Sequence, residues 1–244
     1  MLILGIDSSG SIGALGLYDE KGFLAETNIK LFHRHSEELL TNINFVLKQS
    51  GKTIEEVSAI AVVTGPGSFT GLRIALSTAK TFAQVLDIPL LALSSLDVLA
   101  YNINVDNCYI VPLIDAKRER VYMAAYRKWS KDIKAQKVIE DKASSIEDLL
   151  DELSELDSNA TFYLTGDGAE VYQKFFSKSS LNYKIATDNL NIPRGGAIAE
   201  MGYYYFQEGK AEEDYLKIFP NYMKKPQAEI NWLKKYGTGE SNGN

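Results

Sequence analysis

The chain has 244 residues, of which 45% are hydrophobic and 24% charged, and its 26 basic and 32 acidic side chains leave a net charge of −6. This composition is typical of a globular protein of one large or two small domains, and the acidic balance argues against nucleic-acid binding by the isolated chain. A single cysteine excludes an internal disulfide and suits a reducing compartment. The N-terminal apolar run ends at Asp7, which predicts neither a signal peptide nor a membrane span, so we expect a cytoplasmic protein.

The first hundred residues alternate between short apolar runs and longer amphipathic stretches. Short apolar runs bounded by turn residues are typical of buried strands, and apolar residues at helical spacing are typical of helices. We therefore expect three strands followed by alternating helices and strands. The predicted strands lie at 2–6, 12–18, 23–31, 59–63 and 88–93, and the predicted helices at 36–50, 72–86 and 94–101.

The sequence at 111–126 repeats the pattern at 3–18. Each segment begins with an apolar strand ending in Ile-Asp, at Asp7 and at Asp115, and continues without a gap into a second apolar strand ending in Tyr. Self-similarity on this scale predicts two copies of one β-β-β-α-β-α unit. The alternative is that two unrelated strand–turn–strand pieces share a common dipeptide. The second half adds predicted helices at 145–156, 169–176 and 197–207 and a predicted strand at 161–165.

Polar side chains follow the first predicted strand directly, at Asp7, Ser8 and Ser9. Ligands of α/β sheets bind at the carboxyl ends of strands, where a carboxylate can hold a metal–phosphate or orient a water molecule. The other interpretation is that Asp and Ser simply begin a turn well. The recurrence at Asp115 brings the two interpretations close to even.

A glycine-rich loop at 65–71 joins a strand to the predicted helix at 72–86, through Gly65, Gly67, Ser68 and Gly71. Glycines let the backbone approach a ligand, and the free N–H groups of a helix start attract anions. The spacing matches neither the Walker A motif nor the dinucleotide fingerprint, so a rigid turn or a partner surface is at least as well supported. Arg73 opposes the helix dipole, which suggests a carboxylate or phosphate partner, although a solvated arginine remains the default.

Two turns of the second half are further candidates. Gly166, Asp167 and Gly168 follow a predicted strand and could meet a phosphate or the far side of an interdomain cleft, but Asp-Gly is equally a common turn. A small basic cluster follows Asp115, where it could meet an acidic partner or RNA held by an assembly, or have no specific partner. The basic cluster consists of Lys117, Arg118 and Arg120.

Histidine is scarce. The chain has two, His33 and His35, which could chelate a metal weakly, but no cysteine lies near them, so we predict no metal site. The sequence contains neither a zinc-peptidase motif nor a nucleophile-elbow motif, and no third histidine could complete a triad. These absences argue strongly against hydrolysis by a zinc or a Ser-His mechanism.

Several segments together resemble one known family. MLILGIDSS at the start, GPGSFTGLR at 65–73, LIDAKRERVYMAAY at 113–126 and LTGDGAE at 164–170 are similar to TsaB, also called YeaZ, and PNYMKKPQAE at 220–229 fits the same family. The resemblance implies the α/β actin-like ATPase fold, built from a duplicated ribonuclease H-like unit. It also implies lobes at 1–105 and 106–232, followed by a polar tail at 233–244 that we expect to be disordered.

The resemblance implies a subunit that is not an enzyme on its own. In the catalytic paralogue TsaD, a histidine motif after the strand equivalent to 88–93 binds the metal, whereas Ser95 and Leu99 occupy those positions here. A hydroxyl and an isobutyl group cannot replace two imidazoles. The family's usual Asp-Ala-Arg reads Asp115-Ala116-Lys117, and Lys loses the bidentate geometry of Arg. We therefore expect no cofactor of its own, with ATP and a metal ion on the partner subunits.

The function implied is to bind and activate TsaD in forming N6-threonylcarbamoyladenosine at position 37 of ANN-decoding tRNAs. Pairing is expected through the helices at 36–50 and 72–86, with a homodimer by the same surface in isolation, a TsaE-type small ATPase at the junction, and tRNA bound only through the complex. The alternatives are an ATP-dependent small-metabolite phosphotransferase and, with less support, a metallopeptidase. The candidate interface residues are Leu39, Leu40, Ile43, Leu72, Arg73, Leu76 and Lys80.

Overall fold

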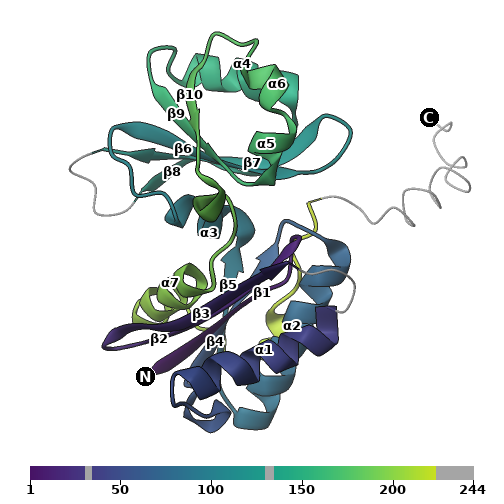
Figure 1. The fold of residues 1–244 in the computed structure, drawn as a ribbon, viewed down its shortest axis with the longest axis vertical. Helices are drawn as coiled ribbons and strands as arrows, with labels where there is room; N and C mark the ends of the chain where they lie inside the picture. The colour runs from purple at the N-terminus through teal and green to yellow at the C-terminus, as the bar shows by residue number, and fades with distance from the viewer. Residues whose placement is uncertain (31–34, 130–134, 224–244) are drawn as a thin grey trace, which may run out of the picture.

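A computed structural model describes residues 1–30, 35–129 and 135–223 and has two lobes (Figure 1). His33 and the predicted tail at 233–244 lie outside the described residues. The first lobe is built on a five-stranded sheet in the order β3-β2-β1-β4-β5. Its central strand pairs antiparallel with β2 and parallel with β4. The strands are β1 (Leu2–Asp7), β2 (Ile12–Asp19), β3 (Gly22–Lys30), β4 (Ala59–Gly65) and β5 (Leu90–Ser94).

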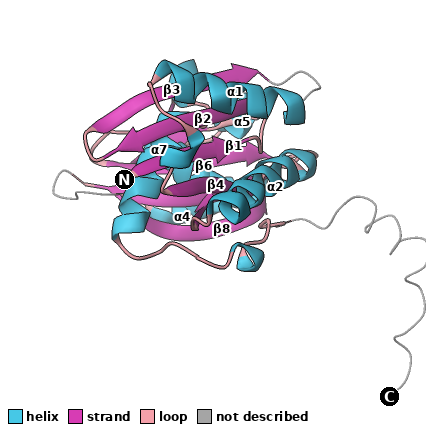
Figure 2. Cartoon of the chain, turned by 90° about the horizontal axis from the view of Figure 1, so that it is seen from below, coloured by secondary structure: helices cyan, strands magenta, loops and turns pink. Residues whose placement is uncertain are grey.

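Three helices cover the two faces of the first sheet. Helices α1 (His35–Gln49) and α2 (Phe69–Leu86) lie on one face and contact each other, as Figure 1 shows from the front and Figure 2 from below. The opposite face carries α7 (Gly195–Gln207). The alternation of β1 explains this sandwich, because Leu4 packs with α1 and α2 while Ile3 packs with α7. Both faces of the sheet are therefore buried.

The second lobe repeats the first. Its sheet has the order β10-β9-β6-β7-β8, and its central strand β6 pairs antiparallel with β7 and parallel with β9, as β1 does with β2 and β4. The predicted duplication and the α/β actin-like fold are thus confirmed. The strands are β6 (Cys108–Asp115), β7 (Arg120–Lys128), β8 (Gln136–Ser145), β9 (Thr161–Thr165) and β10 (Asn182–Ile185). The helices are α4 (Ile146–Leu156), α5 (Asp167–Val171) and α6 (Gln173–Phe176), and α3 (Ser95–Tyr101) joins the lobes.

Several predicted elements differ in extent. Two strands, β8 and β10, were not predicted, because their sequences are mostly polar and they lie at the edges of the second sheet. The predicted helix at 169–176 is two short helices, since Tyr172 leaves helical geometry between them. The helix predicted to open at 72 begins at Phe69, one residue after its N-cap Ser68. Short 3₁₀ helices are η1 (Ile54–Glu56), η2 (Asp188–Leu190) and η3 (Tyr215–Lys217).

The chain returns to the first lobe after completing the second. Helix α7 lies on the first sheet so closely that Gly16 and Gly195 face each other with no room for a side chain on either. The segment after α7 follows it, since Glu212 bridges to Leu90 and the N–H of Asn221 donates to the carbonyl of Thr64. The prediction that all residues from 106 to 232 belong to the second lobe is therefore wrong. Residues 195–207 form a helix that covers the first sheet. Among the described helices, none is long and apolar enough to cross a membrane.

Candidate functional site

The central strand of the first lobe ends in a fully buried carboxyl group. Asp7 has no exposed surface, and its Oδ1 accepts a hydrogen bond from the N–H of Ser9 at 2.7 Å. Its Oδ2 is buried and has no protein partner. Burial, only partly offset by the hydrogen bonds from Ser9, raises the pKa of Asp7 from 3.8 to about 6. This carboxyl group is therefore poised between its two protonation states near neutral pH.

The glycine-rich loop is folded against the turn that follows Asp7. The N–H of Ser68 donates to the carbonyl of Ser9 at 2.6 Å, and the hydroxyl of Ser8 donates to the carbonyl of Gly71 at 2.8 Å. A side chain at Gly71 would lie 1.8 Å from the carbonyl oxygen of Ser8, and one at Gly67 would lie 2.6 Å from that of Ser9. The glycines thus allow two backbone segments to touch, which is the rigid-turn interpretation.

The guanidinium of Arg73 already has partners within the chain. Its guanidinium lies 3.9 Å from the ring centroid of Phe69, and its Nε donates to the hydroxyl of Tyr222 at 3.0 Å. The rings of Tyr222 and Phe69 stack with centroids 4.8 Å apart. The C-terminal segment at 215–223 therefore forms a strap along α2, and Phe219 of the strap lies over Lys80. The carboxylate or phosphate suggested for Arg73 is replaced by an aromatic hydroxyl from the chain itself.

The second lobe neutralises its equivalent carboxylate. The side chain of Asp115 is buried, and it accepts hydrogen bonds from the ammonium of Lys117 at 2.5 Å and from the hydroxyl of Tyr172 at 2.8 Å. Burial opposes ionisation, but these hydrogen bonds hold the pKa of Asp115 below its usual value. The N–H of Asp115 in turn donates to Asp167. Asp115 is therefore an ionised, paired group, unlike Asp7.

Gly166 and Gly168 serve the packing of the second lobe. A side chain at Gly166 would lie 2.3 Å from the carbonyl oxygen of Leu113, and one at Gly168 would lie 3.0 Å from the same atom. Gly166 also has a φ of 92°, which side chains other than hydrogen rarely allow. Its N–H donates to the side chain of Asn191 at 2.5 Å. The turn interpretation of this motif is consistent with these contacts.

A small cavity lies between the lobes and joins four of the predicted residues. Its volume is about 70 Å³, whereas pockets for small molecules of drug or cofactor size span roughly 300–1,000 Å³. Leu99 fills part of the wall, and the hydroxyl of Ser95 is buried there without a protein partner, as is Oδ2 of Asp7. The volume of this cavity is well below that range. The predicted residues that line the cavity are Asp7, Ser9, Gly166 and Asp167.

The remaining candidate residues lie apart from this cavity or serve the loop contacts described above. Ser8, Gly65, Gly67, Ser68, Gly71, Asp115 and Gly168 are not among the residues that line it. Ser95 and Leu99, which stand where the catalytic paralogue is expected to have histidines, line the cavity with a hydroxyl and an isobutyl group. Among the described residues no cluster of three or more His, Cys, Asp or Glu side chains could hold a metal ion.

The protonation state of Asp7 gives a direct test of this geometry. The folded chain binds the Asp7 proton more tightly than the unfolded chain, so the associated stability is present below about pH 4 and lost as the pH rises through about 6. Asn is neutral at every pH, so Asp7→Asn is expected to raise the free energy of unfolding by about 3 kcal/mol at pH 7.5 and to give no gain near pH 3.5. Urea unfolding across this pH range measures the difference between variant and wild type.

A matched control uses a carboxyl group that is already solvated. Asp151 is exposed on α4, and Asp151→Asn is expected to change the free energy of unfolding by less than about 0.5 kcal/mol throughout the same range. A gain for Asp7→Asn that does not depend on pH would contradict the buried, protonatable carboxyl group.

The predicted partner surface is only partly accessible. Leu39, Ile43, Leu72 and Leu76 are buried in the core between the helices and the first sheet, because their apolar spacing serves that packing. Those four residues are therefore unavailable to a partner in this conformation. Leu40 is 53% exposed on α1. Arg73 is exposed but contacts Tyr222 of the strap, and Lys80 is partly exposed beside Phe219 of the strap.

Comparison with known proteins agrees with the duplicated fold. A family model described as TsaD, tRNA N6-adenosine threonylcarbamoyltransferase, matches residues 30–232. The tRNA threonylcarbamoyladenosine biosynthesis protein TsaB of Bacillus subtilis is 31% identical over 236 residues, covering 96% of this chain and 99% of the relative. Among solved structures, a Pseudomonas aeruginosa protein with similarity to the peptidase YeaZ superposes with a TM-score of 0.76 at 21% identity, covering 91% of this chain and 99% of that one.

A structure of YeaZ from Pseudomonas aeruginosa superposes with a TM-score of 0.73 at 21% identity, again over 91% of this chain and 99% of that one. The fold defines an actin-like α/β protein of two lobes, each built on the same arrangement of five strands. The chain belongs to the TsaB (YeaZ) family.

One group of residues was missed by sequence reasoning. Asp97 on α3 pairs with Lys137 on β8 at 2.7 Å and accepts a hydrogen bond from Tyr126 on β7. The sequence carries no signal for this group, because β8 was not predicted and its register places Lys137 opposite Tyr126. These residues line a second and much larger cavity, described below.

Proposed function

We propose that this chain is a non-catalytic subunit that binds and activates a TsaD-type threonylcarbamoyltransferase during formation of N6-threonylcarbamoyladenosine at position 37 of ANN-decoding tRNAs. The observation that carries the proposal is the cleft, whose cavity of about 70 Å³ has Ser95 and Leu99 on its wall. A family member with so small a cleft serves its pathway through binding. The phosphotransferase alternative would need room for a nucleotide, so this cleft gives it no support.

The proposed partners follow from the surface of the first lobe. Helices α1 and α2 lie together on one face of the first sheet (Figure 2). The side chains of Leu40 and Phe45 on α1 are exposed to solvent. Exposed apolar side chains on adjacent helices are typical of an interface between proteins. We assign this face to the TsaD-type paralogue and, in isolation, to a second copy of the chain. A TsaE-type ATPase then joins at the junction, tRNA binds only through the complex, and the protein works in the cytoplasm.

Cofactors are assigned to the partners in this proposal. Among the described residues no cluster of side chains could hold a metal ion, and in the glycine-rich loop the N–H of Ser68 donates to the carbonyl of Ser9. ATP and the metal ion therefore belong to the TsaE-type and TsaD-type subunits, while the present chain supplies binding surface.

The experiment is an affinity capture with the tagged full chain from native bacterial lysate, with the bound proteins identified by mass. Recovery of a TsaD-like paralogue, joined by a small ATPase when ATP is added, is the expected result. Adding the purified chain to that paralogue and ATPase should then restore formation of the modified nucleoside. Recovery of the bait alone, with ATP turnover by the isolated chain, would overturn the proposal.

The cleft and the partner face can be separated by one substitution. Asp7→Ala is expected to leave the affinity for the TsaD-type partner within about threefold of wild type, because Asp7 has no exposed surface and lies at the strand end. Isothermal titration with the purified partner measures this. Loss of partner binding by a variant that still folds would show that the cleft takes part in assembly.

A further inference from the structure

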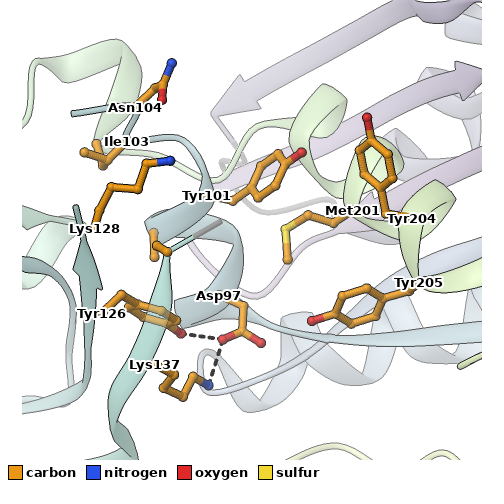
Figure 3. Close-up of a pocket in the computed structure, with 12 residues that line it drawn as sticks. Asp97, Tyr101, Ile103, Asn104, Tyr126, Lys128, Lys137, Met201, Tyr204 and Tyr205 are labelled. Carbon is orange, nitrogen blue, oxygen red and sulfur yellow. Dashed lines mark hydrogen bonds and ion pairs between the residues drawn. The ribbon is translucent and has the colours of Figure 1, made fainter. Parts of the chain in front are cut away.

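A second cavity lies at the junction of the lobes, away from Asp7. Its volume is about 760 Å³, which is within the usual range for a small-molecule site. Its walls come from α3, which joins the lobes, from β7 and β8 of the second lobe, and from α7 on the first sheet (Figure 3). We call it the hinge pocket. Its lining includes Asp97, Tyr101, Tyr126, Lys137, Met201 and Tyr204.

The charged groups of the hinge pocket are paired with one another. Lys137 lies 2.7 Å from Asp97 and 2.7 Å from Asp141, and Lys128 lies 3.9 Å from Asp106. Tyr126 donates its hydroxyl to Asp97, and Figure 3 shows this bond beside the Lys137 ion pair. Because each cation already has an anion, an anionic ligand would have to break an existing pair. The pocket therefore favours an uncharged ligand over an anionic one.

The remaining surface is aromatic. Tyr101 from α3 and Tyr204 from α7 are each 38% exposed, and Tyr205 and Met201 of α7 extend the same wall. Figure 3 shows Tyr101 and Tyr204 on one side of the space and Tyr205 with its hydroxyl directed inward. Burial raises the pKa of Tyr205, so its hydroxyl stays protonated at neutral pH and can donate a hydrogen bond. Aromatic faces and a thioether bind flat rings well.

We propose that the hinge pocket binds an uncharged aromatic or heteroaromatic small molecule, whose ring packs against Tyr101, Tyr204 and Met201 and which accepts a hydrogen bond from the hydroxyl of Tyr205. The same cavity is lined by Tyr126 of β7 and Lys137 of β8 in the second lobe, so a ligand that fills it contacts both lobes at once, because α7 lies on the first sheet. Its binding therefore restrains the lobes relative to each other and stabilises the folded chain by mass action.

The test uses the full chain and three probes, which are indole, adenosine and adenosine monophosphate. Saturation-transfer difference NMR should detect indole and adenosine, and backbone amide shifts should cluster at Tyr101, Ile103 and Met201. The monophosphate should bind no more tightly than adenosine, because the lysines are already paired. Absence of saturation transfer from both uncharged probes, or shifts that cluster at Asp7, would overturn the proposal.

Two variants and one matched control sharpen the result. Tyr101→Ala and Tyr204→Ala are each expected to raise the Kd for adenosine by about fivefold or more, the usual effect of removing one stacking ring. Tyr222→Ala is the control, because Tyr222 is 37% exposed and lies on the strap far from this lining. If a tyrosine variant loses its fold, the shift map of the wild-type chain still decides. Equal Kd values for all three variants would place the probe elsewhere.

Discussion

Gly16→Ala is expected to lower the free energy of unfolding by about 3 kcal/mol or more, the largest stability effect we predict for a single added methyl group. A side chain at Gly16 would lie 2.0 Å from the carbonyl oxygen of Gly195 and 2.1 Å from its carbonyl carbon. Both are backbone atoms, so no rotamer change can relieve the clash. Helix α7 must move off the sheet, and Ile198 and Met201 then lose part of their packing against β1 and β4.

The measurement is urea unfolding followed by circular dichroism, with Gly10→Ala as the matched control. A side chain at Gly10 has no non-neighbouring atom closer than 3.9 Å, and the residue has no positive φ. That variant should change the free energy of unfolding by less than about 0.5 kcal/mol. Equal unfolding midpoints for the two variants would mean that α7 does not hold this close contact in solution.

Leu40→Asp is expected to weaken binding of the TsaD-type partner by about 30-fold or more, which corresponds to an interface hot spot of about 2 kcal/mol. Leu40 is 53% exposed on α1, so the substitution leaves the core intact. At the proposed interface, however, the new aspartate would be buried as a carboxylate that has no cation to pair with. Formation of the modified nucleoside by the reconstituted complex should fall in parallel.

The control for this prediction lies on the other lobe. Val171 is 57% exposed at the end of α5, and Val171→Asp makes the same chemical change away from α1 and α2. It should leave the partner affinity within about threefold of wild type. Unchanged binding by Leu40→Asp, or equal losses for both variants, would refute the assignment of the α1–α2 face.

Local sequence pattern was enough to predict most of the fold. Apolar runs defined β1, β4, β6 and β9, and the repeat of Ile-Asp at the ends of two central strands predicted the duplication. The edge strands β8 and β10 of the second sheet were missed, because a strand with one partner needs few apolar residues. The return of α7 to the first sheet also escaped, since which lobe a helix covers depends on contacts between residues far apart in the chain.

The sequence predicted several of the residues that line the cavity near Asp7, but it did not predict the volume of that cavity. Asp7, Gly166 and Asp167 do line one cavity, as the carboxyl-end argument suggested. Its small volume could not be read from sequence, because it depends on how closely the glycine-rich loop sits on Ser8 and Ser9. The apolar spacing of α1 and α2 was likewise ambiguous, and the buried positions of Leu72 and Leu76 came from the structure alone.

The placement of α7 has a consequence for synthesis on the ribosome. Strands β1 to β5 are complete by residue 94, yet the helix that covers one face of their sheet begins at residue 195. At about 5–20 residues per second, the intervening hundred residues take roughly 5–20 s to translate. During that time the apolar face that includes Ile3 and Leu91 is not covered by α7. A nascent chain whose translation pauses within the second lobe therefore exposes an apolar surface. We expect a holdase chaperone to bind this form of the chain more tightly than the completed protein.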